Sequence, residues 1–163
     1  MDAPTPASSS APALTLERFL PYRLVALSAR TSNALARIYA ERFELTIPQW
    51  RVIATLGQSP VATARDIASH GMMHKSTVSR AVSALVARGL LRKEPNAHDM
   101  REEHLRLTDA GRRIYDSIVP EALAFEARLM TALDPQERRL FLAMIDKLDA
   151  QARSLAPDME IEA

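Results

Sequence analysis

The chain has 163 residues, of which 47% are hydrophobic and 25% are charged, and its formal net charge is +1, as is typical of a soluble globular protein. No apolar run approaches the roughly 18 residues that a membrane-spanning helix requires, and residues 1–13 lack the basic and apolar regions of a signal peptide. The chain contains no cysteine, which excludes disulfides and thiol-based redox sensing, so we expect a cytoplasmic protein without a membrane partner.

The N-terminal part is expected to combine a disordered tail with one long helix. Residues 1–14 are rich in Pro, Ala and Ser, a composition typical of disorder. The apolar stripe that follows has steps of three and four residues and consists of Leu16, Leu20, Leu24, Leu27, Thr31, Leu35 and Ile38. Because proline is tolerated in the first turn of a helix, we expect a short initial turn and then a long helix that starts near Pro21.

Two shorter helices are predicted next. The first begins at Pro48, with Thr46 as a candidate N-cap, and ends by Gly57. The second lies in TARDIASHG, residues 63–71, where a Thr and an Asp three residues later resemble a capping box and the final glycine closes the helix.

The segment HKSTVSRAVSALVARGLLRK, residues 74–93, contains a helix with two different faces, which ends at Gly89. Its apolar stripe is formed by Val78, Val82, Leu85 and Val86. Its other face carries hydroxyls and cations without a carboxylate, namely Lys75, Ser76, Thr77, Ser79, Arg80 and Ser83. A solvated face usually mixes Glu with Lys, whereas this face is suited to a negative partner. A short helix, a tight turn and this helix form the pattern of a helix-turn-helix.

A β-hairpin is predicted after this helix, with the strands LLRKE and HLRLT around the polar turn PNAHDMREE. Its length matches the wing of a winged helix. A further helix is expected to open at Thr108, to run to about Ala132 and to kink at Pro120.

The last helix is predicted to begin with Asp134 as its N-cap and Pro135 at its first position, and to end near Pro157. The terminal helices carry more apolar surface than a winged helix needs. The residues left half-exposed in a monomer are Leu20, Leu24, Leu27, Phe125, Leu129, Phe141, Met144, Ile145 and Leu148. Because exposed apolar surface of this extent marks an interface, we predict a two-fold homodimer built from the N- and C-terminal helices.

The predicted fold is mainly α with a small β-hairpin, in the order α-α-α-α-β-β-α-α, a winged helix-turn-helix. Residues 61–108 contain eight Lys and Arg against five Asp and Glu, whereas residues 109–163 contain seven against eleven. A surface that binds a polyanion is therefore expected in the middle third. We expect residues 46–108 to form a DNA-binding domain, and residues 15–45 and 109–157 to form a helical dimerisation region.

The order of these motifs resembles the multiple-antibiotic-resistance regulator (MarR) family of bacterial transcription factors, from about Leu16 to Leu155. The resemblance rests on LTIPQWRVIATLG, ARDIA, KSTVSRAVSALVARGLLRK and DMREEHLRLTDAGR, of which the last is the most specific. It implies a triangular homodimer whose two recognition helices enter major grooves, and small-molecule or redox effectors that release the DNA. It also implies that Arg101 at the wing tip probes the minor groove and that Asp99 holds Arg101 in place.

The residues expected to contact DNA are His74, Lys75, Ser76, Thr77, Ser79, Arg80, Arg92, Lys93, Asp99 and Arg101. Lys75 is suited to a phosphate, Ser76 and Thr77 to a phosphate or a base edge, and Arg80 to a bidentate contact with guanine. Which of them reads bases stays open at this point. The alternatives are a solvated helix face and, for the wing pair, a surface ion pair that contributes little.

Four residues are candidates for an effector site: Tyr22, Arg23, Arg30 and Trp50. Arginines suit a carboxylate, such as an aromatic acid or its CoA thioester, and the first helix resembles that of regulators of aromatic-acid catabolism. For Trp50 the alternative is simple packing in the core. The histidines match no zinc pattern, and neither a G-x-S-x-G motif nor a phosphate-cradling glycine loop is present, so we expect no metal, no cofactor and no enzyme activity.

The sequence thus predicts a ligand-responsive, sequence-specific DNA-binding regulator. It is expected to act as a homodimer on a palindromic operator with half-sites about one helical turn apart, as a repressor that a small molecule releases. One alternative is a winged-helix module that binds a protein partner without sequence-specific DNA binding. A second is an enzyme or ligand carrier that uses the helical base. The effector, the target genes and the sign of regulation stay open.

Overall fold

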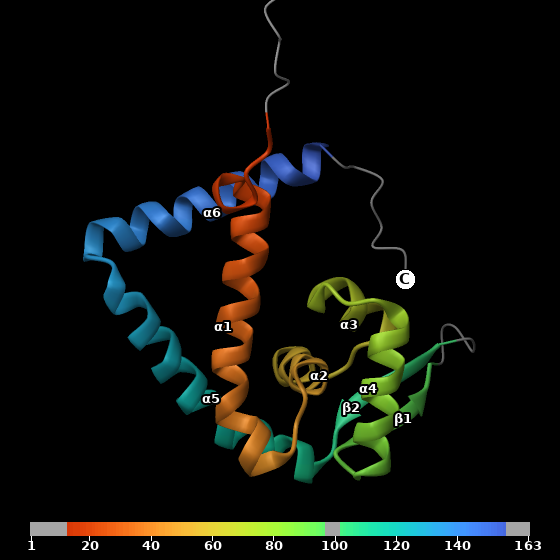
Figure 1. The fold of residues 1–163 in the computed structure, drawn as a ribbon. Helices are drawn as coiled ribbons and strands as arrows, with labels where there is room; N and C mark the ends of the chain where they lie inside the picture. The colour runs from red at the N-terminus through yellow and green to blue at the C-terminus, as the bar shows by residue number, and fades with distance from the viewer. Residues whose placement is uncertain (1–12, 97–101, 156–163) are drawn as a thin grey trace, which may run out of the picture. The chain divides into compact units, whose positions relative to one another are not determined.

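The computed structural model describes residues 13–96 and 102–155, in a chain that divides into two compact units after Ala34. The elements follow the order η1 (Leu16–Arg18), α1 (Leu20–Phe43), α2 (Ile47–Gln58), α3 (Ala64–Gly71), α4 (Lys75–Ala87), β1 (Leu91–Pro95), β2 (Glu103–Leu107), α5 (Asp109–Leu129), η2 (Met130–Ala132) and α6 (Pro135–Leu155), where η marks a short 3₁₀ turn (Figure 1). The predicted order of helices and strands is confirmed. Residues 1–12 of the expected tail lie outside the described residues.

Side chains that bind backbone N–H groups determine where the helices start. The N-caps predicted at Thr46, Thr63 and Asp134 are confirmed. At Thr63 the backbone N–H and the hydroxyl both donate to Asp66 Oδ2 at 2.8 Å, and the Asp66 N–H donates to Thr63 Oγ1 at 3.2 Å. Because α2 begins at Ile47, the proline expected at its first position stands at the second. The helix starts are thus local properties of the sequence.

The turn between α3 and α4 differs in one respect from the expected glycine-closed helix. α3 ends at Gly71 as predicted, but the left-handed residue is Met72, with φ 50° and ψ 51°. A Cβ on Gly71 would lie 2.7 Å from Cε of Met73, a buried side chain that folds back under the turn. By contrast, Gly89 has φ +68° after α4, as expected of a glycine that ends a helix.

The hydrophobic core of the second unit lies among α2, α3, α4, the hairpin and the first half of α5. Its largest fully buried side chains are Tyr39, Ile53, Leu56, Ile67, Leu85, Leu105, Ile118, Val52 and Val78. Trp50 is buried with them, and its ring stacks on Tyr39 at 5.4 Å and on Tyr115 at 6.3 Å between centroids. This packing agrees with the alternative reading of Trp50 as a core residue.

The predicted hairpin is antiparallel, with Leu91 opposite Leu107 and Lys93 opposite Leu105. A third piece of extended chain joins it, because Ala62 and Leu105 form an isolated antiparallel bridge in which the Leu105 N–H donates to the Ala62 carbonyl at 2.8 Å. The sequence pattern did not indicate this bridge. It ties the segment before α3 to the wing.

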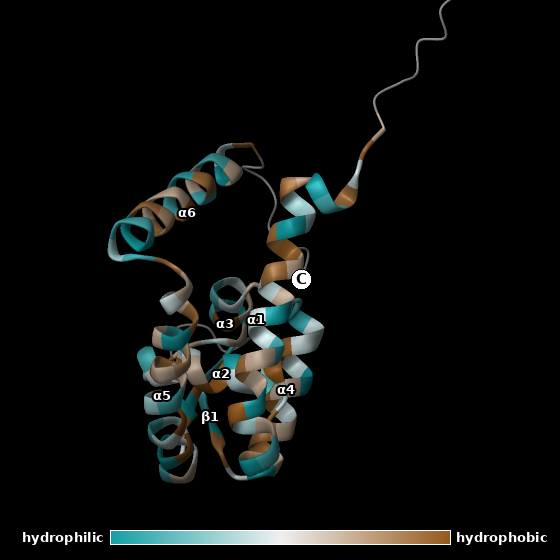
Figure 2. Ribbon diagram, turned by 60° about the vertical axis from the view of Figure 1, so that its left-hand side comes forward, coloured by the Kyte–Doolittle hydropathy of each residue, from teal (hydrophilic) through white to brown (hydrophobic). Residues whose placement is uncertain are grey.

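Eight of the nine apolar residues expected to stay half-exposed are exposed, and the ninth, Phe125, is half-buried. No residue of α6 is buried, and Figure 2 shows hydrophobic residues recurring along this helix. In the first unit Leu20, Leu24 and Leu27 are likewise about half exposed. α5 is assigned as one continuous helix through Pro120, and the kink there stays a prediction. Among the described residues, no helix is long and apolar enough to cross a membrane.

Candidate nucleic-acid interface

The two faces predicted for the helix after the turn are confirmed in α4. Val78, Val82 and Leu85 are buried, and Ala81, which the apolar stripe omitted, is buried with them. α4 packs on α2, α3 and β1 through this face. The opposite face, with its hydroxyls and cations, is exposed apart from the half-buried Thr77. The burial of one stripe therefore determines that the carboxylate-free face is turned to solvent.

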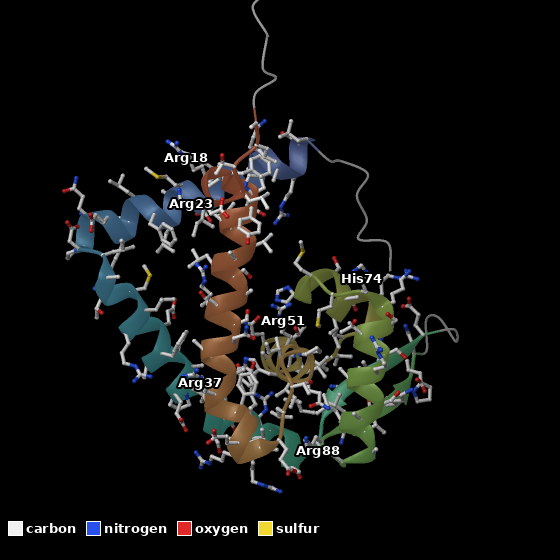
Figure 3. The ribbon with its side chains drawn as sticks, viewed as in Figure 1. Arg18, Arg23, Arg37, Arg51, His74 and Arg88 are labelled. Carbon is white, nitrogen blue, oxygen red and sulfur yellow. The ribbon has the colours of Figure 1, made fainter. Side chains whose placement is uncertain are left out.

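The N-terminal end of α4 is electrostatically suited to an anion. The first turn of α4 carries no acidic residue. No carboxylate of that turn therefore offsets the partial positive charge of the helix N-terminus. His74 lies at this end, as Figure 3 shows, followed by the exposed Lys75 and Ser76. The Arg80 side chain lies along the helix, because its Nε donates to the Ser76 carbonyl oxygen at 3.3 Å. Six of the predicted DNA contacts thus lie within residues 74–80, at the N-terminal end of the helix.

The two cations predicted on the first wing strand are both engaged with carboxylates. Arg92 Nε lies 3.0 Å from Glu94 Oε1. The other carboxylate oxygen of Glu94, Oε2, accepts a hydrogen bond from Arg106 Nε at 2.7 Å. Lys93 Nζ lies 2.6 Å from Glu103 Oε2 across the hairpin. The predicted wing-tip pair, Asp99 and Arg101, lies outside the described residues.

One cation in this region was missed by sequence reasoning. Arg65, in the first turn of α3, forms an ion pair with Glu102 at the base of the wing, with 2.8 Å between Nη2 and Oε1. No local spacing indicates this pair, because α3 and the wing are distant in the sequence. An open cavity of about 260 Å³ lies between α3, α4 and the hairpin; its lining residues are Thr63, Ala64, Arg65, Ser79, Val82, Ser83, Lys93, Glu102, Glu103 and Leu105.

The shifted pKa values in the described residues have structural causes. Hydrogen bonds from the Thr63 backbone and hydroxyl lower the pKa of Asp66. The hydrogen bond from Arg106 lowers the pKa of Glu94. Burial raises the pKa of Tyr39 to about 12, against the charge of Arg51, which lowers it. Within the described ranges, no three His, Asp or Glu side chains gather as a metal site would require.

The candidate effector residues fall into different parts of the chain. Tyr22, Arg23 and Arg30 belong to the first unit, where all three are exposed, and the seven-residue spacing of the two arginines places them on one face of α1. Arg37, also labelled in Figure 3, is exposed and belongs to the second unit. Trp50 belongs to the core of the second unit.

Comparison with known proteins gives a consistent result. The model of the MarR family matches residues 43–102, from the end of α1 to the wing. The HTH-type transcriptional regulator Hpr of Shouchella clausii is 38% identical over 73 residues, which are 45% of this chain. That match spans only 37% of the length of Hpr.

Two solved structures share most of the fold. A transcriptional regulator of the MarR family from Silicibacter pomeroyi is 29% identical, with 91% of this chain and 96% of that chain covered and a TM-score of 0.71. The PcaV transcriptional regulator from Streptomyces coelicolor, solved in complex with its natural ligand, is 26% identical, with 87% and 99% covered and a TM-score of 0.68. The family model thus matches residues 43–102, and the similarity to solved structures covers nearly all of the chain.

Proposed function

This chain belongs to the MarR family of transcriptional regulators, and we propose that it is a sequence-specific DNA-binding protein that recognises a palindromic operator as a homodimer. The observation that carries the proposal is the exposed face of α4, which combines cations and hydroxyls, contains no carboxylate and begins at the positive end of the helix. Such a face fits the major groove, where phosphates attract cations and base edges present hydrogen-bond partners.

Each side chain on this face has a chemically distinct part in the proposal. Lys75 neutralises a phosphate, and Ser76 and Thr77 donate to a phosphate or a base edge from the first turn. Arg80 is long enough to give a bidentate contact to guanine once its Nε leaves the Ser76 carbonyl. Arg92 and Lys93 contact the backbone beside the wing. The resemblance to the family supports a minor-groove role for Arg101, held by Asp99.

The dimer is proposed from the uncovered apolar surfaces of residues 15–45 and 109–157. Leu20, Leu24 and Leu27 in one segment, and Ile145 and Leu148 in the other, are about half exposed in the single chain. Covering such surfaces with a second copy of this chain removes them from water, at about 25 cal/mol for each Å² of apolar area. A two-fold dimer also places two α4 helices on one duplex, which is what a palindromic operator requires.

The regulation is proposed to be repression that a small molecule relieves. The structural relative PcaV was solved with its natural ligand, which supports ligand control in a chain of this fold. The exposed arginines Arg23 and Arg30, with Tyr22 next to Arg23 in the chain, suit an aromatic carboxylate or its CoA thioester. In this proposal the DNA-bound protein blocks transcription of the neighbouring genes. When the compound accumulates, the protein leaves the DNA and those genes are transcribed.

The test is selection of duplex fragments from sheared genomic DNA with the purified protein at near-physiological salt. We expect a single enriched palindrome, and we expect Arg80→Ala to lose the enrichment while Arg113→Ala, an exposed arginine on α5, retains it. A folded, dimeric protein that enriches no sequence would contradict the proposal and favour a winged-helix module that binds a protein partner.

A further inference from the structure

Two cations beside α4 are each held by a carboxylate from one short segment at the base of the wing. Arg65 Nη2 lies 2.8 Å from Glu102 Oε1, and Lys93 Nζ lies 2.6 Å from Glu103 Oε2. The two cations come from different elements, the first turn of α3 and the middle of β1. Their partners are consecutive residues. Glu103, the first residue of β2, and Glu102 just before it therefore supply a pair of negative charges at the junction between the wing and the helix-turn-helix.

All four side chains line the same open cavity of about 260 Å³, and Ser79 and Ser83 of α4 line it as well. These serines belong to the carboxylate-free face of α4. Figure 1 shows α4 beside the hairpin. A DNA strand that passes from a major groove filled by α4 to a minor groove probed by the wing has to cross this junction. Its backbone phosphates are therefore the anions nearest to the cavity.

The accessibility of the side chains favours exchange of partners. Arg65 is 73% exposed and Glu102 only 24% exposed, so the cation is the solvent-facing member of its pair. Lys93 is 42% exposed. Ion pairs between groups this exposed are weak in water, whereas a phosphate accepts two parallel hydrogen bonds from a guanidinium. A phosphate is thus able to replace the carboxylate at Arg65 without a change in the fold.

We propose that this cavity is a seat for a DNA backbone phosphate, and that Glu102 and Glu103 occupy its two cations in the free protein as internal competitors of the phosphate. The inference rests on the proposed DNA-binding function. On binding, Arg65 and Lys93 exchange a carboxylate for a phosphate, and the carboxylates return to water. The free energy of the two broken ion pairs is subtracted from the binding free energy on every sequence alike, because phosphates carry no sequence information. Competition by the two carboxylates therefore lowers the affinity for non-specific DNA and leaves discrimination between bases unchanged.

The test is a double-mutant cycle of Glu102→Gln with Arg65→Ala, read as the affinity for a random-sequence DNA duplex at several salt concentrations. We expect Glu102→Gln alone to bind about two- to fivefold more tightly, the range that an exposed ion pair corresponds to. In the Arg65→Ala background the gain should vanish, because the cation that Glu102 masks is gone. The cycle of Glu103→Gln with Lys93→Ala should behave in the same way.

The matched control is Glu121→Gln, which removes the same charge from another exposed ion pair. Glu121 of α5 lies 3.0 Å from Arg42 of α1, and neither residue lines the cavity. We expect no change in affinity there. A gain at Glu102 that persists without Arg65 would overturn the proposal, since long-range repulsion of DNA would then explain it, and an unchanged affinity would overturn it too. Wild-type protein that binds no duplex at low salt would overturn the DNA-binding function itself. If Glu102→Gln lowered the melting temperature, the Lys93 cycle would decide the result.

Discussion

Arg88, the residue after α4, donates a hydrogen bond of 2.7 Å from Nη2 to the carbonyl oxygen of Phe43, the last residue of α1 (Figure 3). Its Nη1 donates to the carbonyl oxygen of Glu44 at 3.0 Å. Glu44 has a left-handed φ of 50°. A single guanidinium therefore satisfies carbonyl groups that the end of α1 leaves without helical partners, and it joins that end to the end of the helix proposed to read DNA.

Replacing this arginine should destabilise the protein. We expect Arg88→Ala to lower the free energy of unfolding by about 1 kcal/mol, because two charge-assisted hydrogen bonds are lost at an exposed site. Urea denaturation followed by circular dichroism measures the change. Arg113→Ala, at an exposed arginine of α5, is the control and should leave the midpoint unchanged. Equal midpoints for the two variants would show that the Arg88 hydrogen bonds contribute nothing measurable.

Gly111 in the first turn of α5 should tolerate no larger residue. A Cβ there would lie 2.2 Å from the Leu90 carbonyl oxygen, which is backbone and has little freedom to move. We expect Gly111→Ala to cost about 2–3 kcal/mol, as overpacking against rigid surroundings does. The comparison variant is Gly89→Ala, where the φ of +68° is unfavourable but no atom lies within 4 Å of the added Cβ. It should cost less, about 1–2 kcal/mol. A lower urea midpoint for Gly89→Ala than for Gly111→Ala would contradict the close packing of Gly111 against the Leu90 carbonyl group.

Alkaline pH should destabilise the fold through Tyr39. Burial raises the pKa of Tyr39 to about 12 from its ordinary value of 10.0. Above the ordinary value the unfolded chain loses the phenolic proton while the folded chain retains it, so stability falls as the pH rises from about 10 to about 12. Ultraviolet titration should show a late tyrosinate transition that Tyr39→Phe removes. Tyr22→Phe, which alters an exposed tyrosine, should leave that late transition in place.

A charge on the apolar face of α6 should dissociate the proposed dimer. We expect the wild-type chain to have twice its monomer mass of 18.1 kDa in light scattering, and Leu148→Glu to have the monomer mass. Since no residue of α6 is buried within one chain, helicity should be retained. Gln151→Glu introduces the same charge at an exposed position of the same helix and should remain dimeric. A wild-type monomer would contradict the proposed assembly.

Arg101→Ala should weaken operator binding without loss of stability. A charged contact in a narrow minor groove is expected to contribute about 1–3 kcal/mol, which corresponds to roughly ten- to hundredfold in Kd. Fluorescence anisotropy with the selected operator measures the affinity, and thermal denaturation provides the check on folding. Unchanged affinity would remove the wing tip from the interface.

The helices, their caps and the two faces of α4 could be predicted from local patterns in the chain. Thr46, Thr63 and Asp134 were identifiable as N-caps because a cap depends only on residues within one turn of it. The hydroxyls and cations of α4 were identifiable because the apolar stripe and the polar face follow from a spacing of 3.6 residues. These features involve neighbours in the chain, and the structure confirms them.

Contacts between distant segments could not be predicted from such patterns and became visible only in the folded chain. The Ala62–Leu105 bridge, the Arg65–Glu102 pair and the stacking of Trp50 on Tyr115 all join residues far apart in sequence. The left-handed residue after α3 is Met72, and the Met73 side chain that follows it is buried. Local spacing contains no information about such contacts, because they form only when packing of the core brings the α3 turn, α4 and the wing together.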